Sequence, residues 1–108
     1  SLLLFLLVII AIDYITGLLA AGVKGQLNSL VGLKGIAKKV FILALIVVAN
    51  IVDTILDTNS FVRNLTIIFY LSNEMLSIIE NAGSVGLPIP SFLKKAIESL
   101  KDEESTKE

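Results

Sequence analysis

The sequence contains no cysteine, no histidine and no tryptophan, and it has two prolines among its 108 residues. Without cysteine and histidine we expect no disulfide, no thiol nucleophile, no zinc site of the usual kind and no histidine-based acid–base chemistry. Charged residues are also scarce, since they make up 18% of the chain, against about 25% in typical soluble domains. The net charge of −1 and the lack of a basic arm give no indication of nucleic-acid binding.

The short motifs that mark common enzyme classes are missing as well. We find no glycine-rich phosphate loop, no HExxH zinc motif and no nucleophile elbow. Acids at Asp13, Asp53, Glu74 and Glu80 have no nucleophile or soluble domain beside them. We therefore predict a protein that is not an enzyme and that uses no cofactor or metal ion.

Hydrophobic residues are abundant, at 55% of the chain, and the mean hydropathy is +0.86. They fall into three blocks, at about residues 2–23, 40–56 and 61–79. A single charge, Asp13, interrupts the first block, and as a helix rising about 1.5 Å per residue this block is long enough for the ~30 Å hydrocarbon core of a bilayer. A signal peptide would have a basic start, which this run lacks, and the two later blocks favour a multi-pass membrane protein.

The pattern predicts an all-α integral membrane protein with three transmembrane helices and a short C-terminal amphipathic helix. Residues 1–82 are expected to form the membrane domain, and residues 83–108 a cytoplasmic tail. We expect the tail to begin with a Gly/Pro-rich linker, to continue with a helix capped by Ser91 and to end disordered over residues 102–108. The third block contains Arg63 and Glu74, which are costly in lipid, so a helix lying in the membrane interface is the alternative there.

Lysine residues predict the topology. The connector between the first two blocks has four lysines and no acid: Lys24, Lys34, Lys38 and Lys39. The positive-inside rule places this connector and the lysine-containing tail in the cytoplasm, so the N-terminus lies outside. We expect Lys38 and Lys39 to reach towards the headgroups from the start of the second span.

Polar and small residues recur at steps of three and four, which places them on single faces of helices. Gly17 and Ala21 form a small-xxx-small pair that lets another helix approach closely. We predict that the following residues form the pore or assembly surface: Asp13, Thr16, Gly17, Ala21, Asp53, Arg63, Tyr70, Asn73, Glu74 and Ser77.

Two electrostatic expectations follow from these polar helix faces, each of which we call a stripe. Arg63 is predicted to pair with Asp53 or Asp57, because all three lie near the outer ends of adjacent antiparallel spans. Asp13 and Glu74 fall near mid-membrane, where desolvation favours uncharged carboxyl groups. If oligomers expose the stripe to water, the two acids can ionise, and their repulsion would favour an open lumen.

Several segments in this order resemble the toxin-secretion/phage-lysis holin family. The resemblance extends from about Asp13 to Leu100. It is carried by Asp13-Tyr-Ile-Thr-Gly17, Gly32-Leu-Lys-Gly-Ile36 with Lys38-Lys39, Asp53, Arg63, Glu74-Met-Leu-Ser-Ile-Ile-Glu-Asn81 and Gly86-Leu-Pro-Ile-Pro90.

The resemblance implies a small phage or prophage protein of the bacterial cytoplasmic membrane. Such proteins contact membrane lipids, form homo-oligomers and open lesions through which an endolysin, a peptidoglycan hydrolase, or a toxin escapes, and the host is lysed. Two alternatives use the same residues differently. One is a small ion channel or transporter subunit, and the other is a membrane anchor for a soluble partner.

Overall fold

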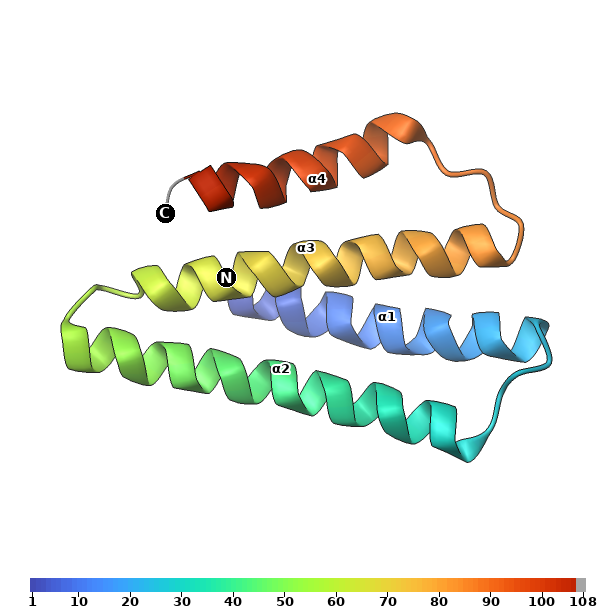
Figure 1. The fold of residues 1–108 in the computed structure, drawn as a ribbon, viewed down its shortest axis with the longest axis horizontal. Helices are drawn as coiled ribbons and strands as arrows, with labels where there is room; N and C mark the ends of the chain where they lie inside the picture. The colour runs from blue at the N-terminus through green and yellow to red at the C-terminus, as the bar shows by residue number, and fades with distance from the viewer. Residues whose placement is uncertain (107–108) are drawn as a thin grey trace.

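The computed structural model describes the backbone of residues 1–106 and the side chains of residues 1–102. The chain forms four helices in this part: α1 (Leu2–Val23), α2 (Ser29–Leu56), α3 (Phe61–Ser84) and α4 (Ser91–Thr106) (Figure 1). Consecutive helices run antiparallel, and α3 contacts each of the other three. The predicted all-α class is confirmed.

Helix α1 has the bounds predicted for the first hydrophobic block. The Ser1 hydroxyl caps it by accepting a hydrogen bond from the Leu4 N–H at 3.2 Å. Aliphatic residues surround the helix almost completely, so its sequence does not select one buried face. The neighbouring helices therefore decide which of its residues are buried.

Helix α2 begins earlier than the hydrophobic pattern indicated. We predicted a second span from about Val40, preceded by a connector, but the helix is continuous from Ser29. The Asn28 side chain caps it by accepting from the Val31 N–H at 2.9 Å. The helix includes Gly32 and Gly35, which weaken an isolated helix but which here face another side chain closely, as described below.

The C-terminal ends of α3 and α4 also differ from the predicted boundaries. α3 continues to Ser84, beyond the predicted end near residue 79. α4 continues to Thr106, so residues 102–106 are helical where we expected disorder, and residues 107–108 lie outside the described part of the chain. The acids of this segment, Asp102, Glu103 and Glu104, are compatible with helix, and polarity alone was a poor guide.

The buried apolar core lies towards one end of the α1–α3 bundle. Its members come from the first half of α1, the middle of α2 and the first half of α3: Leu6, Ile10, Ile42, Ile46, Ile67 and Leu71. In the next turn along each helix, the side chain that points into the bundle is charged: Asp13 in α1, Lys39 in α2 and Glu74 in α3. The bundle thus has an apolar half, containing these six residues, and a polar half, which contains the candidate site.

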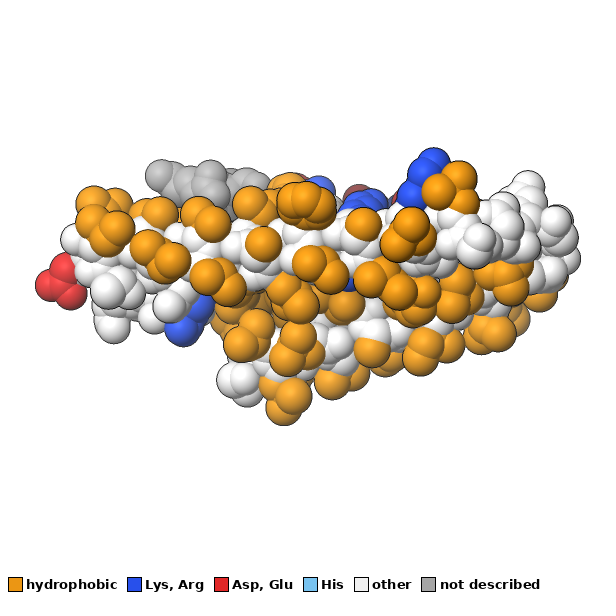
Figure 2. All heavy atoms as spheres, turned by 90° about the horizontal axis from the view of Figure 1, so that it is seen from below, with side chains coloured by type: hydrophobic (Ala, Val, Ile, Leu, Met, Phe, Trp, Pro, Cys, Tyr) orange, Lys and Arg blue, Asp and Glu red, His pale blue; other side chains and the backbone are white. Residues whose placement is uncertain are grey.

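Most of the apolar surface of α1 and α2 faces outwards (Figure 2). Among the described residues, these are the two helices long and apolar enough to cross a membrane, and 17% and 22% of their most hydrophobic windows are buried within the chain. A core helix of a soluble protein would bury far more of such a window. The outward apolar surface is therefore suited to lipid or to further copies of the chain.

Candidate functional site

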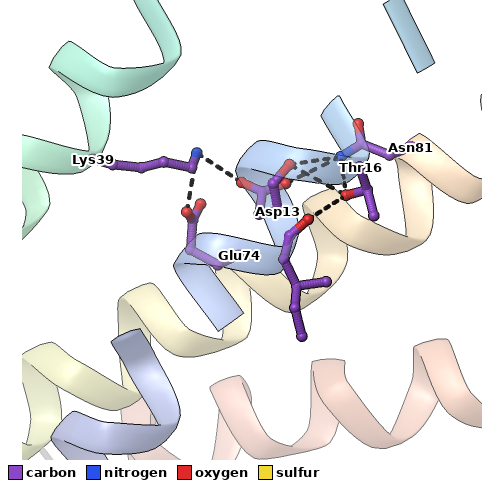
Figure 3. A network of polar contacts seen from close by, with 6 residues as sticks. Asp13, Thr16, Lys39, Glu74 and Asn81 are labelled. Carbon is purple, nitrogen blue, oxygen red and sulfur yellow. Dashed lines mark hydrogen bonds and ion pairs between the residues drawn. The ribbon is translucent and has the colours of Figure 1, made fainter. Parts of the chain in front are cut away.

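A buried cluster of charged side chains joins α1, α2 and α3 at the start of the polar half. The Lys39 ammonium lies 2.8 Å from Asp13 Oδ2 and 3.2 Å from Glu74 Oε1 (Figure 3). The lysine side chain is 13% exposed, and each acid is 5% exposed. Each of the three helices contributes one charge, so the cluster ties the bundle together.

An amide side chain completes the coordination of Asp13. Asn81 donates to Asp13 Oδ1 at 3.1 Å and to the Thr16 hydroxyl at 3.0 Å (Figure 3). Thr16 in turn donates to the Ile12 carbonyl oxygen at 2.8 Å. Both oxygens of Asp13 therefore have partners, one on α2 and one on α3.

Glu74 is less well satisfied than Asp13. Its Oε1 has the ionic contact with Lys39 but accepts no well-aligned hydrogen bond from the described residues. Two carboxyl groups thus share one ammonium, and the cluster carries a net charge of −1 when all three groups are ionised. A buried excess charge is costly in a medium of low dielectric constant. The cluster is therefore sensitive to whether water or lipid surrounds it.

Tyr14 packs on the glycines of α2 beside this cluster. Its hydroxyl donates to the Gly32 carbonyl oxygen at 3.3 Å. A Cβ at Gly35 would lie 3.1 Å from the tyrosine ring, and one at Gly32 would lie 3.3 Å from the hydroxyl. The two glycines therefore allow α2 to approach Tyr14, and two of the segments that carry the family resemblance meet here.

Two hollows adjoin the cluster. A cavity of about 180 Å³ lies in the polar half, and a groove of about 480 Å³ runs between α2 and α3. Ser77 lines both. The cavity is lined by Asp13, Tyr14, Gly17, Leu18, Val31, Gly35, Lys39, Ser77 and Asn81. The groove is lined by Lys38, Phe41, Ile42, Leu45, Tyr70, Asn73, Glu74 and Ser77.

Many of the residues singled out from the sequence meet around these hollows. Asp13, Gly17 and Ser77 border the cavity, and Thr16 contacts Asn81 next to it. Tyr70, Asn73, Glu74 and Ser77 border the groove. Ala21 is buried farther along α1.

The assignment of Lys39 to the membrane surface is contradicted. Its ammonium points between two helices and pairs with acids near the middle of α1 and α3, whereas Lys24, Lys34 and Lys38 are exposed. Sequence reasoning grouped it with the other lysines because hydropathy placed it before the second span. Its helical position relative to the buried Ile42 and Ile46, at steps of three and seven, was the available signal.

The predicted ion pair of Arg63 is also wrong. Asp53 caps the start of α3, where it accepts from the backbone N–H groups of Val62 and Arg63 at 2.9 and 2.7 Å and from the Thr58 hydroxyl. The Arg63 guanidinium instead donates to Asn50 Oδ1 and Asn64 Oδ1, each at 3.4 Å. Asp53 and Arg63 lie at the opposite end of the bundle from the cavity.

Comparisons with known proteins agree with the motif pattern. The profile of the bacteriophage holin family matches residues 1–102. A probable holin of Bacillus phage phi105 is 36% identical over 95% of this chain and 78% of its own length. An uncharacterised protein of Halalkalibacterium halodurans is 49% identical over 93% of this chain and 78% of its own, and one of Clostridium perfringens is 41% identical over 94% and 76%. No solved structure matches.

Proposed function

The chain belongs to the bacteriophage holin family, and we propose that it acts as a holin in the cytoplasmic membrane of a bacterial host. In this role, copies of the chain accumulate in the membrane, oligomerise and open lesions. An endolysin, or a toxin in a host that makes one, then leaves the cytoplasm, and lysis follows. The observation that carries this proposal is the family match over residues 1–102.

The outward surface of the bundle supports a membrane location. We propose that α1, α2 and α3 all span, with the N-terminus outside and the α1–α2 loop inside. The exposed Lys24 and Lys34 lie near that loop and fit the positive-inside rule, and the exposed Lys38 lies about one helical turn farther along α2. α3 packs along α1 and places Glu74 beside Lys39, so it would share the membrane depth of the other two helices.

The buried charged cluster is our candidate for the part of the chain that changes on opening. In a dry bundle, Lys39 offsets much of the cost of burying Asp13 and Glu74. In an oligomer whose lumen contains water, the groove between α2 and α3 would become wet, and Tyr70, Asn73 and Ser77 would supply a wettable wall. Hydration would then offset the loss of the ion pairs.

A channel within a single copy receives less support. The cavity leads towards the cluster from the polar half, whereas Leu6, Ile46 and Ile67 fill the bundle on the other side of it. Ions crossing one copy would have to pass this apolar core. We therefore expect an aqueous path to form between copies of the chain and not through the bundle of a single copy.

The proposed function is tested by induced expression in bacteria with and without a co-expressed cytoplasmic peptidoglycan hydrolase. We expect an abrupt loss of membrane potential after a delay in both strains, and lysis only in the strain with the hydrolase. Slow ion leakage without release of the hydrolase would support a channel instead. An intact membrane in both strains would support an anchor.

The role of the cluster is tested by Glu74→Gln and by cysteine labelling. We expect Glu74→Gln to insert and oligomerise but to change the time of opening, because the substitution removes one of the two acids. A cysteine at Ser77 should react with a water-soluble thiol reagent after opening, whereas a cysteine at Leu76, one residue away on the helix, should not. Equal labelling of both, or none at Ser77, would leave Glu74 as a packing residue.

A further inference from the structure

The polar cavity leads from the charged cluster to one end of the bundle. It borders Asp13 and Lys39 and extends to Val31 and Asn81, which lie near the α1–α2 loop and the end of α3 (Figure 1). On the other side of the cluster, the six aliphatic residues of the apolar core fill the space between the helices. In the proposed topology the α1–α2 loop is cytoplasmic. The cluster therefore has a polar route to the cytoplasm and an apolar barrier towards the outside.

The cavity is suited to hold water. Its volume of about 180 Å³ has room for several water molecules, because one water needs about 10–15 Å³ of cavity. Buried water also needs polar partners. The cavity offers the carboxyl group of Asp13, the ammonium of Lys39, the hydroxyl of Ser77 and the amide of Asn81. Water in this position can deliver a proton to Asp13 or remove one.

Asp13 and Glu74 are placed to share a proton. Their carboxyl groups are close enough for a hydrogen bond with each other, and both contact the Lys39 ammonium (Figure 3). An ionised carboxylate only accepts hydrogen bonds, so a bond between two carboxyl groups requires a proton on one of them. One proton would also remove the net charge of −1 that two carboxylates and one ammonium bury together.

The other ionisable groups around the pair do not take the place of this proton. On α1, the Tyr14 hydroxyl donates to a backbone carbonyl oxygen of α2. On α2, Lys38 borders the groove but is exposed. On α4, the Lys101 ammonium donates to Asn73 Oδ1 at 2.7 Å. Among the described residues, Lys39 is the cation in ionic contact with both acids.

We propose that Asp13 and Glu74 together bind one proton, which they exchange with the cytoplasm through the polar cavity. This inference rests on the proposed function and names what regulates the cluster. With the proton bound, the cluster has no net charge and the dry bundle keeps it. When the proton passes to cytoplasmic water, a charge of −1 stays behind, and hydration of the groove becomes the more favourable state. A higher cytoplasmic pH therefore speeds opening.

The shared proton is tested by infrared spectroscopy of the full chain in a maltoside detergent, which has no carbonyl group of its own. At neutral pH we expect the carbonyl stretch of one protonated carboxyl group per chain. Glu74→Gln and Asp13→Asn should each lose this band, because one carboxylate and Lys39 already balance. Lys39→Met should raise the band towards two groups per chain. Glu80→Gln, at an exposed position of α3, is the control and should leave the band unchanged.

The cytoplasmic route is tested in bacteria that express the chain at constant external pH. A membrane-permeant weak acid, such as benzoate, lowers the cytoplasmic pH. We expect the rate of opening to fall by a factor that approaches ten per pH unit, the limit for one exchanged proton. Glu74→Gln is the matched control: the weak acid changes the energy of the membrane equally for both chains, but the rate of this variant should not follow cytoplasmic pH.

The outcomes separate this inference from the proposed function. No carboxyl band in the unmodified chain, or a band that persists in Glu74→Gln, would overturn the shared proton. Equal responses of the two chains to the weak acid would overturn its role in opening. A response to external pH at constant cytoplasmic pH would overturn the cytoplasmic route. The infrared band does not depend on opening, so a band without any opening in cells would contradict the holin function and leave the proton site standing.

Discussion

The two halves of the α1–α3 bundle are held together by different interactions. In the apolar half, six aliphatic side chains fill the space between the helices. In the polar half, Asp13, Lys39 and Glu74 join the helices through charges, and a cavity remains beside them. In a bilayer, contacts with lipid tails can replace contacts between aliphatic side chains of two helices, but lipid tails cannot replace an ion pair. The apolar half therefore supplies packing, and the polar half supplies a contact that depends strongly on its surroundings.

The largest effect is expected from breaking the charged cluster. Lys39→Met leaves two buried acids without their cation, and removing one partner of a buried ion pair typically costs about 3–5 kcal/mol. Unfolding in detergent, followed by circular dichroism, measures this loss. The loss should shrink at acidic pH, where the carboxyl groups become neutral.

A neutral version of the same cluster is the control. Adding Asp13→Asn and Glu74→Gln to Lys39→Met should recover most of the stability, since no buried charge is left. A Lys39→Met protein as stable as the unmodified chain would show that the cluster does not hold the polar half together.

A smaller loss is expected in the apolar half. Leu6 is fully buried, and Leu6→Ala leaves a void; we expect a loss of about 1–2 kcal/mol, less than in a soluble protein because lipid is itself apolar. Leu19→Ala is the matched control, because Leu19 is 64% exposed on the same helix. The same detergent unfolding compares the two, and equal losses would contradict the assignment of the core.

Removing the Asp53 cap, at the end of the apolar half, should lower the stability of the protein less than removing a side chain of that core. Asp53→Ala removes the acceptor for the first N–H groups of α3, and we expect a lower unfolding midpoint than for the unmodified chain. Arg63→Ala should have a smaller effect, because the guanidinium contacts amides at 3.4 Å rather than a carboxylate. If Arg63→Ala were the more damaging change, the predicted ion pair would have to be reconsidered.

The smallest effect concerns the helix contact in the polar half. Gly35→Ala would place a methyl group 3.1 Å from the Tyr14 ring, and we expect a loss of about 1 kcal/mol as the ring moves. Gly22→Ala is the control, since the nearest side-chain atom lies 3.9 Å away. Unfolding midpoints of the two variants should differ, and a harmless Gly35→Ala would show that Tyr14 can repack freely.

Sequence patterns predicted some features of this molecule well. The length of the first apolar run matched α1, because a helix surrounded by aliphatic residues needs no partner to reveal it. Asp13 and Glu74 stood out because charges are rare in such runs. The meeting of the two acids around Lys39 was not predicted, since hydropathy sorts residues by depth and not by the neighbour they face.

The sequence alone determined the helical class, the apolar surfaces and the residues that carry the family resemblance, because these depend on composition and on local order along the chain. The tertiary structure decided which groups meet. Lys39 faces the interior of the bundle because the packing of α2 on α1 and α3 brings it to Asp13 and Glu74. Asp53 caps α3 because the turn brings the start of α3 to it. Pairing depends on the rotation and register of packed helices, which neither hydropathy nor spacing within one helix contains.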